Sequence, residues 1–158
     1  MTKEWSHLPN AKQIDWVIET LKKKPEVWSA AWDAAWDAAR NSMLDAPWWT
    51  YVKKAEFYAA RDAANEASWD AVQDASRVAV WGAALNAARD SILDAVLSAE
   101  LESAKSAAWD AISALIAWDD SSELLTMPIM RVEELRRSGM PAAKLLLYAV
   151  IVKSKLYH

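Results

Sequence analysis

Apolar residues recur along the chain at the three- to four-residue spacing of amphipathic helices, and no segment alternates as a β-strand does. The first helix is expected from Asn10, which can cap it, to Lys24, because Pro25 ends it and starts the next helix. The buried face of the first helix is predicted to consist of Ile14, Val17, Ile18 and Leu21.

The remaining prolines and one glycine divide the rest of the chain. A second helix is expected over 26–45, and Pro47 marks another start. Asp120, Ser121 and Ser122 offer caps for a short turn that runs to 125. Two final helices are expected over 128–137 and 141–155, separated by a Ser138-Gly139 cap.

A repeat with a period of four residues fills the middle of the chain, and its clearest copy is WDAAWDAAR at 32–40. Its first position holds mainly Trp, Arg or Leu, its second is mostly acidic, and its third and fourth are mostly Ala. An α-helix turns about 100° per residue, so the third and fourth positions form one face and the second lies roughly opposite. The pattern predicts close Ala contact faces, acidic residues in solvent, and Trp at the border, where it covers the seams between helices.

The period of four also limits helix length. Four residues turn an α-helix by about 400°, so each row of equivalent repeat positions shifts by about 40° around the helix per repeat. Over 57–117 such a row would wind more than once around a single helix. The stretch is therefore expected to break into two or three helices, at 82–86 and at 98–103. The competing expectation is one long helix in a right-handed oligomeric bundle.

The length and composition of the chain indicate its fold class. The chain has 158 residues with 32 Ala, 11 Trp, only two Gly and no Cys. These numbers predict an all-α protein, a compact bundle of about five to seven helices forming one domain over 1–158. Within it we distinguish an N-terminal helix (1–25), acidic repeat helices (26–119) and basic C-terminal helices (120–158).

The formal net charge of −4 conceals a strong asymmetry. The charge is +2 over 1–25, −10 over 26–127 and +4 over 128–158. Such asymmetry is typical of proteins that steer a partner or join copies head to tail. The alternative is an ordinary solvated acidic surface with Lys and Arg at helix C-termini.

Few residues are suited to catalysis or metal binding. The only histidines, His7 and His158, lie at the chain ends, and no phosphate-binding Gly loop, GxSxG or HExxH motif is present. Asp119-Asp120 is best explained as a helix end, and Glu133-Glu134 as a solvated face. We therefore expect no enzyme, no cofactor and no metal site.

The first residues lack a signal peptide, and the longest apolar run, 145–152, is too short to span a membrane. A cytoplasmic protein is expected.

The Trp and Arg row of the repeat is the feature with binding potential, because both residue types are enriched at interaction hot spots and can stack on nucleobases. Adjacent Trp side chains after Pro47 point about 100° apart, so one of them is expected to face a partner. For most of these Trp the alternative is a role in packing, and duplex nucleic acid is not expected because the chain is net acidic. The candidate binding residues are Trp32, Trp36, Arg40, Trp48, Trp49, Trp69, Arg77 and Trp81.

At WDAAWDAAR the chain resembles a loose group of bacterial and bacteriophage Ala-rich proteins with long DAAWDAAR-type runs, some labelled as immunity proteins. The resemblance covers about 28–41 and 57–118 and carries over no functional residue. By analogy of class it implies a non-catalytic, homo-oligomeric binding protein, a phage-encoded inhibitor of a host defence protein. The alternatives are a sponge that sequesters a small signalling nucleotide and a structural oligomerisation module.

Overall fold

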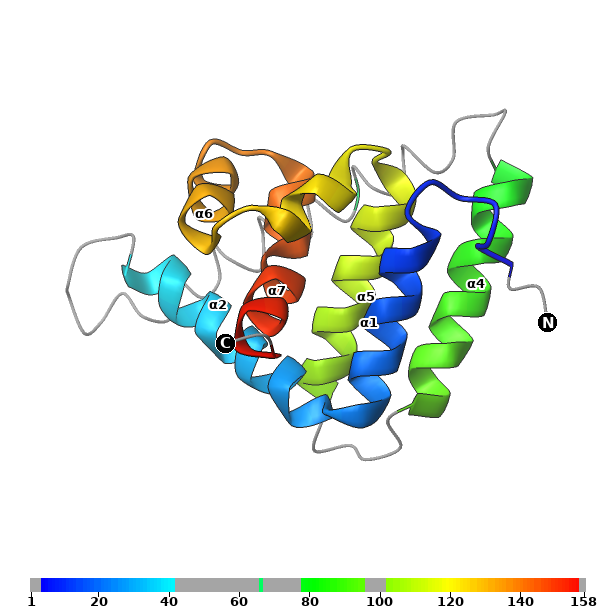
Figure 1. Cartoon of the computed structure of the whole chain (residues 1–158), viewed down its shortest axis with the longest axis horizontal. Coiled ribbons are helices and arrows are strands. Elements are labelled where there is room, and N and C mark those ends of the chain that lie inside the picture. Colours follow the sequence, from blue (N-terminus) through cyan, green and yellow to red (C-terminus); the bar gives the residue numbers. More distant parts are fainter. Residues whose placement is uncertain (1–3, 42–65, 67–77, 96–101, 157–158) are drawn as a thin grey trace.

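The computed structural model describes the backbone of residues 4–41, 66, 78–95 and 102–156, and side chains except those of 35–41 and 78–81. These ranges contain helices and no strand, so the predicted all-α class is confirmed (Figure 1). The elements are α1 (Ala11–Lys23), α2 (Pro25–Asn41), α4 (Val78–Ala95), α5 (Glu102–Ala117), the 3-10 helix η2 (Ser121–Thr126), α6 (Ile129–Arg137) and α7 (Pro141–Leu156).

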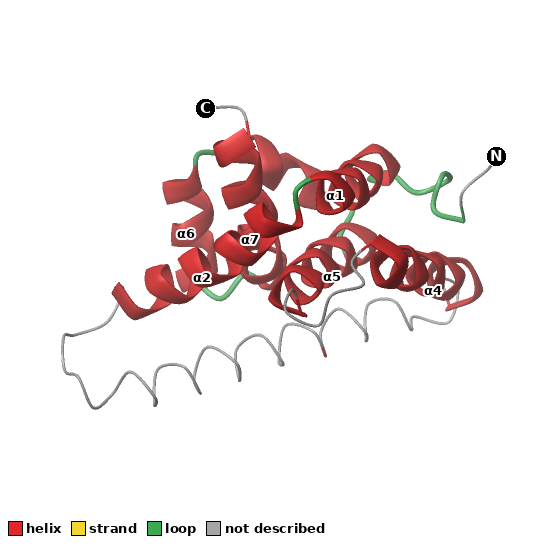
Figure 2. Ribbon diagram, turned by 90° about the horizontal axis from the view of Figure 1, so that it is seen from below, coloured by secondary structure: helices red, strands yellow, loops and turns green. Residues whose placement is uncertain are grey.

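Helix α5 lies at the centre of the fold and packs against α1, α2, α4 and α7. Figure 2 shows α1 seated across α4 and α5 on one side. A helix with neighbours on several sides needs small side chains, because these let the partner backbones approach to the short end of the usual 8–10 Å spacing. The buried residues of α5 include six alanines: Ala104, Ala107, Ala108, Ala111, Ala114 and Ala117.

Helix α7 is the second central element and contacts α2, α5, α6 and η2. The run from Leu145 to Val152 is buried without interruption. A helix that is apolar on all sides is stable in water only when other elements surround it. The segment that sequence analysis judged too short to span a membrane is thus a core helix. No helix in the described ranges is long and apolar enough to cross a bilayer.

The predicted boundaries set by proline and glycine are confirmed where the structure describes them. Pro25 and Pro141 are the first residues of α2 and α7, and Pro128 directly precedes α6. Proline suits these positions because the first backbone N–H groups of a helix have no partner within it. Gly139 ends α6 with φ of 97°, which a residue with a side chain rarely adopts. The predicted face of α1 is also buried as expected.

The four-residue repeat is partly correct in α4: its fourth and second positions lie as predicted, but the third-position Ala83 is exposed and the first-position Leu85 is buried. In α4 the fourth-position residues Ala84, Ala88 and Ile92 are buried, and the acidic Asp90 and Asp94 are exposed. In α2 the first-position residues Trp28 and Trp32 are buried in the core, so their prediction as border residues is wrong.

In α5 the second-position Asp110 is only 2% exposed, so its predicted place in solvent is also wrong. The reason is that α5 has neighbours on several sides, which leaves this part of the helix without a solvent face.

The first predicted break, at 82–86, is wrong because α4 continues through it. Gly82 costs a helix about 1 kcal/mol relative to Ala, and the Ala-rich flanks and the packing of α4 against α1 and α5 outweigh this. The second predicted break overlaps 96–101, which lies outside the described residues, but α4 and α5 on either side of it are separate helices that pack together. The alternative of one long helix is therefore wrong.

Asn10 precedes α1 as predicted, but its side chain does not cap that helix. It is buried, and its Nδ2 donates to the carbonyl oxygens of Leu115 at 2.9 Å and Trp118 at 3.1 Å. The last carbonyls of a helix have no partner within it. Ser121 supports the same region, because its hydroxyl donates to the Trp118 carbonyl at 2.7 Å. Asn10 thus ties the start of α1 to the end of α5.

We predict that Asn10→Asp lowers the free energy of unfolding by about 3 kcal/mol, measured by urea denaturation. The change keeps the shape of the side chain. It removes both N–H donors and sets a carboxylate against carbonyl oxygens at the negative end of α5. The exposed Lys12→Gln serves as the control and should change stability by less than about 0.5 kcal/mol. Equal stability of the two variants would contradict the role given to Asn10.

Candidate functional site

One predicted binding residue, Trp32, has a described side chain, and it lies in the core. Its ring stacks on Tyr148 of α7, with centroids 5.3 Å apart and planes inclined by 22°. Trp36, Arg40 and Trp81 belong to α2 and α4, but their side chains lie outside the described residues. Trp48, Trp49, Trp69 and Arg77 also lie outside the described residues. A binding role for these seven residues stays a prediction.

Other described tryptophans also serve packing. Trp28 is buried against the side chain of Trp16, and its indole Nε1 donates to the Thr20 hydroxyl at 3.1 Å. Trp5 is buried too and donates to the Asp15 carboxylate at 2.9 Å. A buried indole needs a partner for its N–H, and both residues have one. These contacts join the N-terminal segment, α1 and α2.

An open apolar groove lies between the η2–α6 junction and α7. Extended backbone at Met127 and Pro128 carries the chain out of η2 and into the first turn of α6. Ile129 and Met130 occupy that turn and are exposed, Met130 by 78%. The groove has a volume of about 670 Å³ and is lined by Leu125, Thr126, Met127, Pro128, Ile129, Met130, Val150, Lys153 and Ser154. We call it the η2–α7 groove.

The η2–α7 groove was not predicted from the sequence. The available signal was the run Met127-Pro128-Ile129-Met130. Pro128 marks a helix start, and the apolar residues beside it lie at the end of a helix, where side chains can remain exposed. Periodicity alone does not indicate which surface of the protein these residues line, because that depends on how α6 packs against α7.

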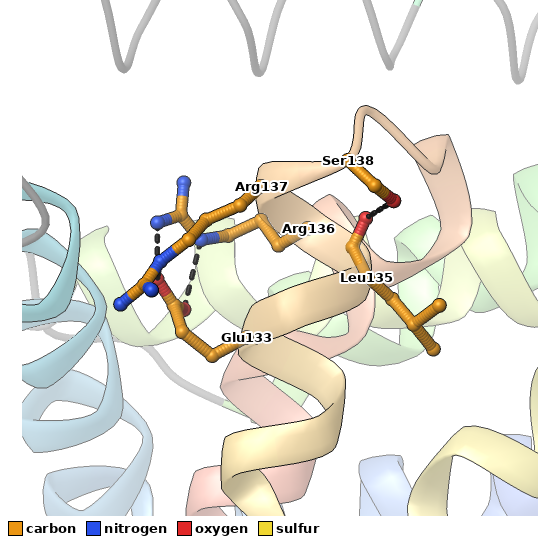
Figure 3. Close-up of polar contacts among 5 residues, drawn as sticks. All are labelled: Glu133, Leu135, Arg136, Arg137 and Ser138. Atoms are coloured by element: carbon orange, nitrogen blue, oxygen red, sulfur yellow. Dashed lines mark hydrogen bonds and ion pairs between the residues drawn. The ribbon is translucent and has the colours of Figure 1, made fainter.

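The acidic side chains of α6 are held by arginines of the same helix (Figure 3). Arg136 binds the Glu133 carboxylate through Nε, at 2.9 Å from Oε2, and through Nη2. Arg137 Nε lies 3.3 Å from Glu133 Oε1, and Arg131 pairs with Glu134 at 3.2 Å. The side chain of Glu133 is only 12% exposed, so its prediction as part of a solvated face is wrong. Glu134 remains exposed as expected.

The charged residue in the lining of the groove is basic. Both acids of the segment 128–158 are paired within α6, and six basic residues belong to the same segment. Lys153 stands in the groove wall itself. The arrangement offers apolar contact and one positive charge. Within the described ranges no three His, Asp or Glu residues gather closely enough to hold a metal ion.

Comparisons with known proteins add no relative: no family, curated protein or solved structure matches this chain.

We predict that Met130→Gln changes the free energy of unfolding by less than about 0.5 kcal/mol, because its side chain is mostly in solvent. Val132→Ala, two residues along α6, should cost about 2 kcal/mol because Val132 is buried. Thermal or urea unfolding of both variants tests this. A loss at Met130 as large as the loss at Val132 would mean that Met130 serves the fold rather than a partner.

Proposed function

We propose that this chain is a non-catalytic binding protein that captures a partner protein in the η2–α7 groove. The observation that carries the proposal is the exposure of Met130 and Ile129 beside an open apolar groove. Exposed apolar groups that gather at a groove mark interaction sites more often than scattered ones do. Methionine suits such a surface because its flexible, polarisable side chain adapts to different partners.

The partner element that fits this groove is an amphipathic helix with acidic residues beside its apolar face. Its apolar face would lie against Leu125, Ile129 and Val150, which line the groove. Its acidic residues would meet Lys153 and the basic surplus of the segment 128–158. Complementary charge of this kind raises the association rate and fixes the orientation of the bound helix.

The resemblance of the repeat to Ala-rich bacterial and bacteriophage proteins supports a narrower form of the proposal. In that form the chain is a phage-encoded inhibitor that acts in the host cytoplasm on a defence protein. We also propose that it works as a homo-oligomer, which the opposite charges of its middle and its C-terminal segment support. Light scattering measures the oligomeric state directly.

The test compares three forms of the full chain as bait in a bacterial extract: the unmodified chain, Met130→Glu and Leu93→Glu. Leu93 lies on α4 and is 48% exposed, so it gives a matched apolar-to-acidic control on another element. We expect a stoichiometric partner that the unmodified chain and Leu93→Glu retain and Met130→Glu loses, because a carboxylate in the groove repels an acidic helix.

Circular dichroism should show the same helix content for all three forms. The proposal fails if no stoichiometric partner is recovered, or if Met130→Glu retains the partner as well as the unmodified chain does.

A further inference from the structure

A second hollow lies between α4 and α5, apart from the η2–α7 groove. Its volume is about 400 Å³, and its lining residues are Arg89, Ile92, Leu93, Glu102, Lys105, Ser106 and Trp109. The α4 residues stand three and four positions apart, and so do the α5 residues, so each set belongs to one helix face. We call it the α4–α5 cleft. It brings an indole, a guanidinium, an ammonium and a hydroxyl to one place.

Lys105 is the unusual member of this cleft. Its side chain is only 16% exposed, and its Nζ lies 3.3 Å from the Glu102 carboxylate. Glu102 is 67% exposed, so its carboxylate has room to turn away into solvent. A pair with one exposed partner gains little free energy, because water screens the charges. A ligand anion can therefore take the place of Glu102 at little cost.

Basic side chains outnumber acidic ones in the lining of the cleft. Arg89, on the facing helix, is exposed and lines the same cleft. Arg89 and Lys105 are thus set against a single carboxylate of the lining, that of Glu102, which can turn away into solvent. Glu102 and Lys105 also lie in the first turn of α5, where the positive end of the helix dipole favours an anion.

The other part of the cleft is flat and apolar. Trp109 is half-buried, one turn beyond Lys105 on the same face of α5. Ile92 and Leu93 of α4 also line the cleft, and Leu93 is 48% exposed. An indole set among aliphatic side chains accepts a planar aromatic ring by stacking, which is worth about 1–3 kcal/mol for a nucleobase.

We propose that the α4–α5 cleft binds a nucleoside monophosphate, with its base against Trp109 and its phosphate between Arg89 and Lys105. Pockets of about 300–1,000 Å³ hold small ligands, and 400 Å³ lies near the lower limit, which favours one nucleotide over a larger molecule. The Ser106 hydroxyl is placed to donate to a phosphate oxygen or to accept from a ribose hydroxyl. This site is independent of the partner proposed for the η2–α7 groove.

The test is isothermal titration of the full chain at low salt with AMP, GMP, CMP and UMP, and with adenosine and inorganic phosphate as partial ligands. We expect saturable binding of at least one nucleotide, and binding of adenosine and of phosphate at least about tenfold weaker than that of AMP, a difference of about 1.4 kcal/mol. Arg89→Gln should weaken nucleotide binding about tenfold, because a direct partner of the phosphate is lost. Glu102→Gln should strengthen it, because the competing carboxylate is removed.

Arg131→Gln is the matched control, since Arg131 is an exposed arginine on α6, away from the cleft. The Arg131→Gln variant should bind the nucleotide with the same affinity as the unmodified chain. Trp109→Leu should weaken nucleotide binding at least about fivefold, because the stacking contact with the base is lost. Thermal unfolding shows whether that variant remains folded. The proposal is overturned if none of the four nucleotides binds, if adenosine binds as tightly as AMP, or if Arg89→Gln binds as well as Arg131→Gln.

Discussion

The packing of small side chains around α5 is the constraint on which the rest of the fold depends. In the described part of the chain four α-helices and η2 contact α5, and they can do so because much of its buried surface consists of alanine. Alanine combines the highest helix propensity with the smallest side chain that a helix interior tolerates well. Larger residues at these positions would separate the surrounding helices and open gaps that the other core side chains could not fill.

Large buried side chains lie on α5 and α7 as well as on the helices around them. Trp28 fills the space between α1 and α2, and Trp32 joins α2 to α7 through its stack on Tyr148. Asn10 and Ser121 close the end of α5 with hydrogen bonds that reach it from α1 and from η2. Alanine where helices approach closely, combined with large apolar side chains elsewhere in the core, explains how a chain that is about one-fifth alanine builds a dense core.

The local features of this fold could be predicted from the sequence. The prolines and Gly139 act within one turn of the backbone, so the starts of α2, α6 and α7 and the end of α6 could be placed in advance. The buried face of α1 follows from periodicity, since one side of that helix meets the core. For Asp110, Trp28 and Trp32 the prediction fails, because periodicity indicates which residues share a face but not how many faces a helix buries.

The candidate sites could be predicted least, because each lies between elements that are brought together only by folding. Met130 and Lys153 are 23 residues apart in the sequence, and Arg89 and Trp109, the farthest members of the α4–α5 cleft, are 20 residues apart. The Trp and Arg row was predicted to bind because Trp and Arg are enriched at interaction hot spots. Its members Trp28 and Trp32 pack in the core, whereas Arg89 and Trp109, at the same repeat position, line a cleft.

The most direct test of this account is the free energy of unfolding of Ala108→Leu compared with that of Ala83→Leu. Both positions lie in Ala-rich helices, and Leu is nearly as good a helix former as Ala, so the variants differ mainly in surroundings. Ala108 is buried in α5 and Ala83 is exposed on α4. The account predicts a loss of about 1–3 kcal/mol for Ala108→Leu and almost none for Ala83→Leu. If Ala108→Leu is as stable as Ala83→Leu, close packing around α5 does not hold the fold together.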